Sequence, residues 1–274
     1  HTSDCKVDYT PIIGEPIDLA RFAELGKKGV LLLMSDSTNA ERPGYSMSER
    51  TVGKSFENIF VNTRCRILVA TFASNIHRIQ QVVDAAIKYD RKVAICGRSM
   101  LNVCRKALEL GYLTIPEGIL IDIKHIKNYK PNRLVIISTG SQGEPMSALS
   151  RMALGEHRQV EITDGDLVVI SASPIPGNEK SVSGVINELF KKGANVIHET
   201  QADVHVSGHA FQEELKLMYS IVRPKYFMPI HGEYRHLKQH ANIVKGLGMP
   251  EENILLMEIG QVLEINSEQA CING

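Results

Sequence analysis

The chain has 274 residues, 43% of them hydrophobic, so it can bury one large core or two smaller ones. Lys and Arg together number 31, as do Asp and Glu, and this zero net charge argues against a protein that binds nucleic acid through an overall basic surface. No apolar run approaches the roughly 18–20 residues needed to span a membrane as a helix, which argues against a membrane protein.

The five cysteines are widely spaced and form no CxxC pair. An odd, scattered set in a chain of this length is typical of reduced thiols rather than of disulfides. We therefore expect a cytoplasmic protein whose cysteines take no part in metal binding.

Short apolar runs rich in β-branched residues recur along the chain and predict strands. Several of the runs are uninterrupted rather than alternating, which is typical of strands covered on both faces. They lie at residues 30–34, 67–70, 93–96, 134–137, 167–170, 226–230 and 254–257.

Amphipathic helical patterns separate most of these strands. The first has Ser74 as its expected N-cap, the second and third stop at Gly111 and Gly193, and the fourth stops before Pro224. The alternation of strands and helices predicts an α/β fold with a parallel-rich sheet, whereas the residues after 250 predict a hairpin around Gly260. The four helical patterns cover residues 74–90, 99–112, 181–194 and 212–224.

Loops rich in glycine and serine follow several of the predicted strands. Because the carboxyl ends of parallel strands meet at one edge of a sheet, these loops predict a rim that binds an anion through N–H groups and hydroxyls. After the strand 134–137, the hydroxyls of Ser138 and Ser141 precede a helix that we expect to begin with Glu144 and Pro145. The same pattern also fits a plain turn between a strand and a helix.

Three histidines stand among glycine, serine and apolar residues. His205 and His209 flank a turn at Gly208, and we expect His209 to lie at the start of a helix, where N–H groups would lower the basicity of its imidazole. His231 ends a predicted strand, a position that suits a metal ligand, with Glu233 near enough to support it. Each one taken alone also fits an ordinary core or surface histidine.

Two acids complete the set of candidate residues. Asp36 ends the first predicted strand, and Asp4 follows a short polar stretch. By themselves they fit a turn acid and a surface acid. They become candidates for a site only if the histidines converge on them.

Several segments, taken in chain order, resemble the ribonuclease J family. They include "HTSDCKVDYTPI", "SDSTNAERPGYSMSE", "TFASNIHRIQQ", "STGSQGEPMSALSRMA", "VHVSGHA" and "YFMPIHGEYRHL". The resemblance implies an α/β fold in which part of a metallo-β-lactamase αββα sandwich carries an inserted β-CASP α/β domain. It also implies a hydrolase with two zinc ions that cuts RNA phosphodiester bonds as a 5′-to-3′ exonuclease and an endonuclease, in RNA processing and decay.

The resemblance assigns roles to matching residues of this chain. Asp4 matches the aspartate that bridges the two metals, and His231 matches a metal ligand. Asp36 matches the first β-CASP motif acid, and His209 matches the histidine beside the scissile phosphate, so both are expected to be catalytic. Ser3 stands where the family usually has glycine. The residues expected to bind RNA or its phosphate are His205, Ser207, Gly208, Ser138, Gly140, Ser141, Arg98 and Ser99.

The resemblance also implies boundaries. We expect residues 1–48 and 207–274 to belong to the metallo-β-lactamase domain and residues 49–206 to form the β-CASP domain. The HxHxDH signature of the family does not occur in the sequence, so we expect a partial chain, without the first part of the metallo-β-lactamase domain and without the C-terminal domain, that is inactive alone. The full-length protein is expected to form a homo-oligomer and not to bind membranes.

Two other interpretations stay open at this point. The chain could bind single-stranded RNA or a 5′-phosphate without cutting, which the Ser/Gly-rich loops would support. It could also be a metallo-β-lactamase relative that acts on small substrates, or one of the other β-CASP nucleases of RNA processing or DNA repair. An inserted domain and loops suited to phosphate favour nucleic acid, and "STGSQGEPMSALSRMA" fits ribonuclease J best.

Overall fold

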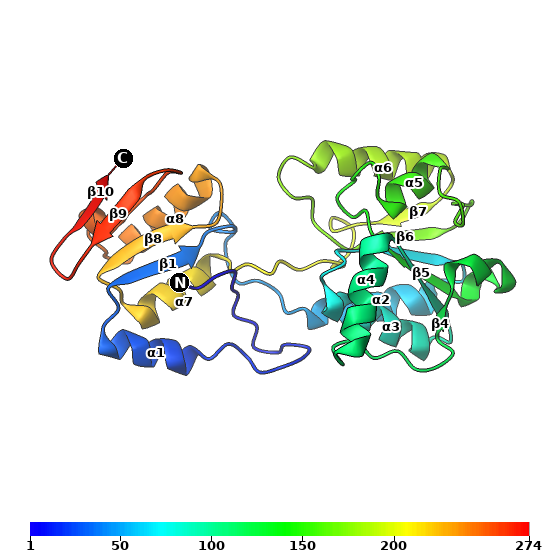
Figure 1. Cartoon of the computed structure of the whole chain (residues 1–274), viewed down its shortest axis with the longest axis horizontal. Helices are drawn as coiled ribbons and strands as arrows, with labels where there is room; N and C mark the ends of the chain where they lie inside the picture. Colours follow the sequence, from blue (N-terminus) through cyan, green and yellow to red (C-terminus); the bar gives the residue numbers. More distant parts are fainter. Residues whose placement is uncertain (274) are drawn as a thin grey trace. The chain divides into compact units, whose positions relative to one another are not determined.

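The computed structural model describes residues 1–273, which divide into two compact units. The inserted unit is Glu49–Val206. The outer unit is His1–Ser48 together with the segment that starts at Ser207 (Figure 1). No helix in the described part of the chain is both long enough and apolar enough to span a membrane.

A six-stranded parallel sheet in the order β4-β3-β5-β2-β6-β7 forms the centre of the inserted unit. One face packs against α2 (Arg50–Asn62), α3 (Ile76–Lys88) and α4 (Arg98–Glu109), and the other packs against α5 (Ala148–Leu154) and α6 (Glu179–Lys191) (Figure 1). The strands are β2 (Ile67–Ala70), β3 (Lys92–Cys96), β4 (Leu120–Ile121), β5 (Leu134–Ser138), β6 (Leu167–Ile170) and β7 (Asn195–Ile197). Two 3-10 turns, Ile123–Asn128 and Pro131–Arg133, lead into β5.

Uninterrupted apolar strands explain this two-sided core. In β2, Ile67 and Val69 belong to the core under α2–α4, whereas Leu68 and Ala70 belong to the core under α5 and α6. Every residue of that strand is buried because both faces are covered. The predicted α/β class and parallel sheet are confirmed.

The outer unit contains a short parallel pair of strands with helices packed around it. Strand β1 (Leu32–Asp36) pairs with β8 (Tyr226–Ile230), and Asp36 is opposite Ile230 in the register. The buried core includes Leu33 and Phe227 from these strands. The helices are α1 (Leu19–Lys28), α7 (Gln212–Val222) and α8 (Tyr234–Gly246), and a 3-10 turn covers Glu251–Asn253.

The C-terminal hairpin lies further along the chain than predicted. Strand β9 (Val262–Ile265) pairs with β10 (Ala270–Asn273), so the hairpin turn follows Ile265 and is not at Gly260. The Asn266 side chain accepts the N–H groups of Glu268 and Gln269 and so fixes that turn. The predicted strand 254–257 is wrong, because only Ile254 bridges to β8.

Two predicted helix starts were also wrong. Asn75, not Ser74, caps α3, because its side chain accepts the N–H of Arg78. Helix α5 does not begin at Glu144 and Pro145. Its N-cap is Ser147, and Glu144 and Pro145 belong to a turn in which the Ser147 N–H donates to the carbonyl of Glu144.

Candidate active site

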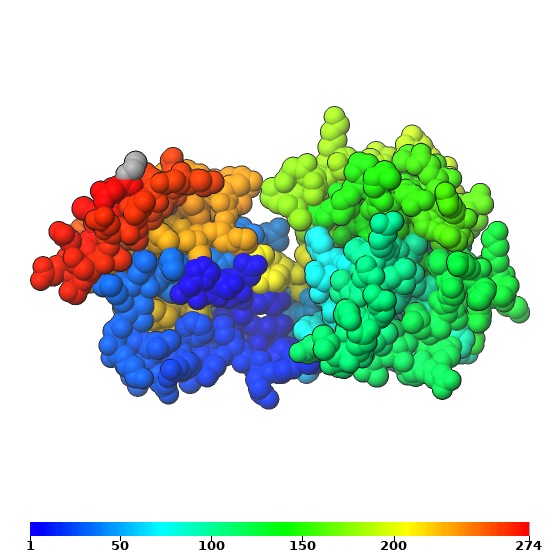
Figure 2. All heavy atoms as spheres, viewed as in Figure 1, coloured from blue at the N-terminus to red at the C-terminus, as the bar shows by residue number. Residues whose placement is uncertain are grey.

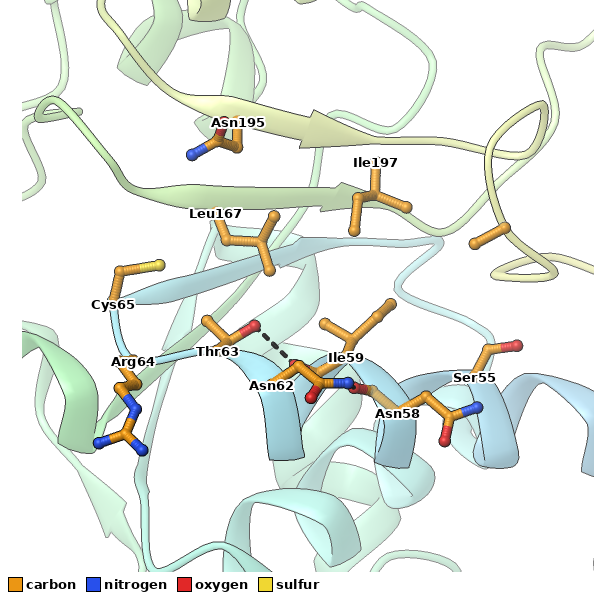
Figure 3. Close-up of a pocket in the computed structure, with 11 residues that line it drawn as sticks. Ser55, Asn58, Ile59, Asn62, Thr63, Arg64, Cys65, Leu167, Asn195 and Ile197 are labelled. Atoms are coloured by element: carbon orange, nitrogen blue, oxygen red, sulfur yellow. Dashed lines mark hydrogen bonds between the residues drawn. The ribbon is translucent and has the colours of Figure 1, made fainter.

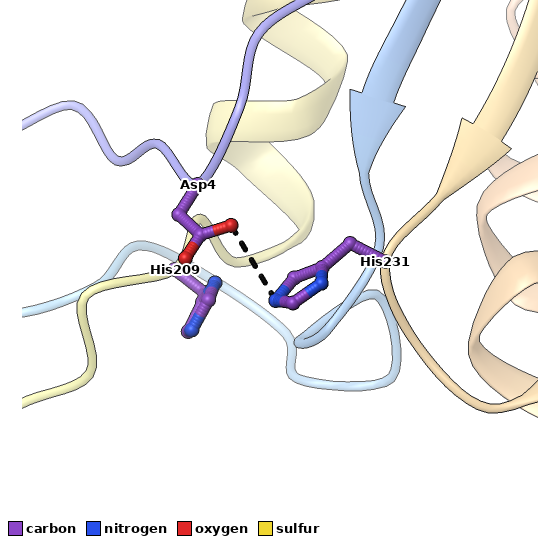
Figure 4. A group of neighbouring side chains, drawn as sticks. All are labelled: Asp4, His209 and His231. Carbon is purple, nitrogen blue, oxygen red and sulfur yellow. Dashed lines mark ion pairs between the residues drawn. The ribbon is translucent and has the colours of Figure 1, made fainter.

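Asp4, His209 and His231 come together in the outer unit (Figure 4). Each offers one ligand atom, and these atoms all lie within 4.8 Å of one another. Oδ1 of Asp4 is 3.4 Å from Nε2 of His231. The centroids of the two imidazole rings are 5.4 Å apart. One carboxylate and two imidazoles form a donor set that suits zinc.

Asp36 holds His209 from behind. Oδ2 of Asp36 lies 2.7 Å from Nδ1 of His209, and Oδ1 accepts the N–H and the hydroxyl of Thr38. Only 1% of the Asp36 side chain is exposed. Because Asp36 occupies Nδ1, the other ring nitrogen of His209 is left to meet a ligand or a substrate.

The prediction of a weakly basic His209 was wrong. Its hydrogen bond to Asp36 raises the pKa of His209, although burial acts in the opposite direction. Helix α7 begins only at Gln212, so the imidazole lies before the first turn and the neighbouring carboxylate decides its basicity. Burial by itself would raise the pKa of Asp36, but hydrogen bonds from His209 and Thr38 outweigh it and lower that pKa.

The parallel pairing of β1 and β8 places Asp36 and His231 at the same end of the two strands. His231 has φ +56°, a left-handed conformation that is uncommon outside glycine. Its carbonyl accepts the N–H of Ser37 and the hydroxyl of Thr38, which hold the backbone in that conformation. At the next residue, Gly232, a Cβ would lie 3.0 Å from Cβ of His236, so a larger residue there would require His236 to shift.

A buried histidine supports this end of β1. Nδ1 of His240 lies 3.0 Å from Oγ of Ser37, and its ring packs edge-on against Phe227. Burial lowers the pKa of His240 to about 3, so the ring is neutral at ordinary pH. His240 is therefore a core residue of the outer unit. Glu233, expected to support His231, instead hydrogen-bonds Arg235.

Ser207 and Gly208 lie in the turn that leads to His209. Oγ of Ser207 accepts the backbone N–H of His209 and an N–H of the Asn39 side chain. The Asn39 amide also donates to the carbonyl of His209. Gly208 is exposed. The hydroxyl predicted to hold RNA phosphate thus fixes the backbone that carries His209.

Sequence reasoning missed two residues, Asn39 and Glu214. Asn39 is buried and connects the loop after β1 to the turn before α7. Glu214 is completely buried in the first turn of α7 and accepts hydrogen bonds from three segments of the outer unit. The available signal for Glu214 was its place three residues after Phe211, the spacing of a capping box.

The remaining candidates lie in the inserted unit. Ser138 and Ser141 are buried, whereas Arg98 and Ser99 open α4 and are exposed. The register pairs Cys96 with Ser138, so the loops that follow β3 and β5 are neighbours.

Gly140 and His205 also belong to the inserted unit. Gly140 has φ +108°, and a Cβ there would lie 2.4 Å from Oγ of Ser147. The conformation and packing of this loop therefore require glycine, whether or not the loop binds phosphate. His205 is half-buried near the end of the unit.

The inserted unit also contains a groove of about 740 Å³ beside α2 and strands β6 and β7 (Figure 3). Its lining combines apolar side chains, such as Ile59 and Ile197, with the amides of Asn58, Asn62 and Asn195. No carboxylate or imidazole is among the lining residues, so the groove offers no general acid or base of those types. The candidate hydrolytic chemistry therefore belongs to the Asp4 cluster. Figure 2 gives the same view with all atoms as spheres.

Two family profiles match the chain. Residues 64–189 match the ribonuclease J β-CASP domain, within the inserted unit. Residues 195–255 match a Zn-dependent metallo-hydrolase RNA specificity domain, which includes His209 and His231.

Curated relatives are similar over nearly the whole chain. Ribonuclease J 1 of Streptococcus pyogenes is 50% identical over 100% of this chain and 49% of its own length. Ribonuclease J of Helicobacter pylori is 48% identical over 97% of this chain and 38% of its own length. Ribonuclease J of Synechocystis is 45% identical over 100% and 43% respectively. The chain thus spans about half the length of these relatives or less.

A crystal structure of a protein of unknown function from Enterococcus faecalis V583 has a similar fold. Its TM-score is 0.56 at 13% sequence identity, over 93% of this chain and 54% of that chain. At that identity the similarity concerns the fold alone.

Proposed function

Since the chain belongs to the ribonuclease J family, we propose that it forms part of the catalytic body of a metal-dependent ribonuclease that hydrolyses RNA phosphodiester bonds. The observation that carries the proposal is the convergence of Asp4, His209 and His231, whose ligand atoms lie within 4.8 Å of one another. We assign the outer unit to the metallo-β-lactamase domain and the inserted unit to the β-CASP domain. The cleavage modes proposed are 5′-to-3′ exonuclease and endonuclease.

The side chains of the cluster fit a metal ion. Carboxylate oxygen and imidazole nitrogen, the donors that Asp4 and His231 offer, are both zinc ligands. We assign Asp4 and His231 to hold zinc, with Asp4 as the bridge between two ions. Bound zinc would supply a water of lowered pKa and would neutralise charge on the phosphate.

His209 is proposed to act on the substrate directly, and Asp36 is proposed to act in catalysis through the His209 ring. The hydrogen bond from Asp36 raises the pKa of His209 and so favours its protonated form. A protonated His209 can give the proton of its free ring nitrogen to the oxygen that leaves phosphorus, or can steady the charge on that oxygen. Asp36 keeps the ring oriented and balances its charge.

RNA is the proposed substrate and partner. Exposed Arg98 and Ser99 at the start of α4 are suited to phosphate, because a guanidinium and N–H groups face solvent there. Ser207 and Gly208 border His209, and we assign them to the phosphate next to the scissile bond. Within the inserted unit, we also assign His205, Ser138, Gly140 and Ser141 to RNA binding, with Ser138 and Ser141, which are buried, supporting the loop rather than touching RNA.

The proposal extends to assembly and compartment. All five cysteines are free thiols, which suits a reducing compartment, so we place the protein in the cytoplasm. Homo-oligomerisation is proposed for the full-length protein.

Metal binding and RNA cleavage test the proposal together. Zn²⁺ uptake by the full-length protein is measured by elemental analysis, and the visible spectrum of bound Co²⁺ reports the coordination. We expect Asp4→Asn and His231→Ala to lose metal, whereas His209→Ala should keep it and lose catalysis in the full-length protein. A full-length protein that takes up no metal, or variants that bind metal as it does, would contradict the assignment of Asp4 and His231.

A binding function without cleavage is the second candidate, supported by the exposed side chains of Arg98 and Ser99. It predicts that the chain retains 5′-phosphorylated RNA, releases 5′-hydroxyl RNA and binds less tightly as salt increases. Full-length protein that binds RNA in this way but cuts none with Zn²⁺ or Mn²⁺ present would favour this candidate over the first.

A further inference from the structure

Glu214 accepts more hydrogen bonds than the capping of its helix or the candidate chemistry requires. Its side chain is completely buried, and its two oxygens accept four hydrogen bonds. Oε1 accepts the N–H of Val7 and the hydroxyl of Ser46, both at 2.8 Å. Oε2 accepts the N–H of Ser46 at 2.7 Å and the N–H of Phe211 at 2.9 Å. Both oxygens act only as acceptors, which is the pattern of a carboxylate and not of an amide.

The donors belong to segments that carry the candidate site. Val7 lies three residues after Asp4, and Phe211 lies two residues after His209. Ser46 belongs to the loop that continues from Asp36. Glu214 thus holds three stretches that are far apart in the sequence at one point, close to the residues whose ligand atoms converge.

A second set of contacts runs parallel to this one. The carbonyl of Cys5 accepts the N–H of Ala210 at 2.8 Å. The ammonium of Lys6 donates to the carbonyls of Ser207 and Met47. These bonds fix the direction of the N-terminal segment. Glu214 binds that segment at Val7, which is the one fully buried residue among residues 1–8.

We propose that Glu214 is a positioning residue. Its carboxylate sets the distance between Asp4 and the two histidines, His209 and His231, without binding the metal ion itself. The proposal rests on the proposed function only for the identity of that ligand, a divalent metal ion. Burying a carboxylate is costly unless donors surround it, and four donors from three segments make the assembled site the arrangement that satisfies it.

Glu214→Gln (E214Q) is the sharpest test, since it preserves the shape of the side chain. Glutamine has one oxygen, which can keep the two N–H donors at Ser46 and Phe211. Its NH₂ group must then face the N–H of Val7, and two donors repel each other, whereas the hydroxyl of Ser46 can rotate to accept. E214Q should therefore release the N-terminal segment and leave the start of α7 intact.

The control is Glu213→Gln, the same chemical change one residue earlier, where the carboxylate makes a partly exposed ion pair with Lys216. Amide hydrogen exchange of residues 1–8, followed by mass spectrometry, measures the release directly and needs no metal. Co²⁺ titration of the full-length protein measures the consequence for metal affinity. We expect at least tenfold faster exchange in E214Q than in the control, and Co²⁺ affinity about 10–100-fold weaker.

Each outcome has one meaning. Exchange and Co²⁺ affinity equal to those of the Glu213→Gln control would overturn the positioning role. Failure of the full-length parent protein to bind Co²⁺ would instead refute the metal assignment, and the exchange result would still decide the role of Glu214. If E214Q does not fold, Val7→Pro removes the same hydrogen bond from the donor side, and unchanged exchange of residues 1–6 would then overturn the role.

Discussion

Replacing Asp36 by asparagine (D36N) should lower the pKa of His209 and weaken the outer unit. Oδ2 of Asp36 lies 2.7 Å from Nδ1 of His209, and the Asp36 side chain is 1% exposed, so solvent screens the pair little. Asparagine can keep the bonds from Thr38 on its oxygen, but it turns an NH₂ group toward Nδ1. The ring must then accept at Nδ1 and carry its proton on the other nitrogen.

The size of the effect follows from the type of bond that is lost. A hydrogen bond to a charged partner contributes about 1.5–3 kcal/mol, and a neutral one contributes about 1 kcal/mol. Since D36N exchanges the first type for the second, it should reduce the free energy of unfolding by about 1–2 kcal/mol under conditions where the pair is charged.

The loss has a definite dependence on pH. The pKa of His209 is raised above 6.5 by the Asp36 hydrogen bond, so this stabilisation is fully present below pH 6.5 and disappears as pH rises through the raised pKa. Burial opposes ionisation of Asp36, but its hydrogen bonds from His209 and Thr38 prevail and its pKa is below 3.8. That stabilisation is present above pH 3.8 and disappears as pH falls through the lowered pKa.

D36N should therefore cost most between about pH 4 and pH 6.5. Urea unfolding of metal-free protein near pH 5.5 and near pH 9 measures the cost, and NMR titration of the imidazole signals measures the pKa of His209. Asp84→Asn, an exposed carboxylate in the inserted unit, is the matched control. An equal cost at both pH values, or an unchanged His209 titration, would refute the reasoning.

Two further substitutions test other features of the fold. Ser3 has φ +55°, so Ser3→Gly should relieve a left-handed conformation and raise the free energy of unfolding by about 0.5–1 kcal/mol in urea; a decrease would show that the Ser3 side chain matters more than the strain. The Arg78 side chain is completely buried and donates to Glu49, Ser171 and Val204. Glu49 and Val204 lie at the two ends of the inserted unit, and Ser171 directly follows β6. Arg78→Met should therefore destabilise that unit by about 3 kcal/mol in urea unfolding. The control is Arg105→Met on the exposed surface of α4, and a loss of stability no larger than that of the control would contradict the prediction.

Local sequence pattern was sufficient for most strands and for the ends of β1 and β8. Uninterrupted apolar runs such as 67–70 and 134–137 can be satisfied only where both faces are covered, so they predict buried parallel strands. A polar residue at the end of such a run, such as Asp36 or His231, must then lie at the edge of the sheet. Turn details were less predictable, because Asn75 and Ser74 compete for the same cap, and only the backbone conformation selects one.

Local pattern could not show what surrounds each candidate. Asp4 and His231 are 227 positions apart by residue number, yet their side chains are 3.4 Å apart. Their approach depends on hydrogen bonds from Val7 and Phe211 to Glu214, a residue that looks like an ordinary helix-start acid. The basicity of His209 likewise depends on Asp36 and not on its own neighbours in the chain.

The sequence by itself therefore determined the residue types of the site and the strand ends that carry two of them, because periodicity and burial act over a few residues. Only the tertiary structure decided which charges and hydrogen-bond donors meet. Those contacts join segments far apart in the chain, and their energy depends on distance and burial in the folded state. For the same reason, the burial of Ser138 and Ser141 could not be predicted from the residues next to them in the chain.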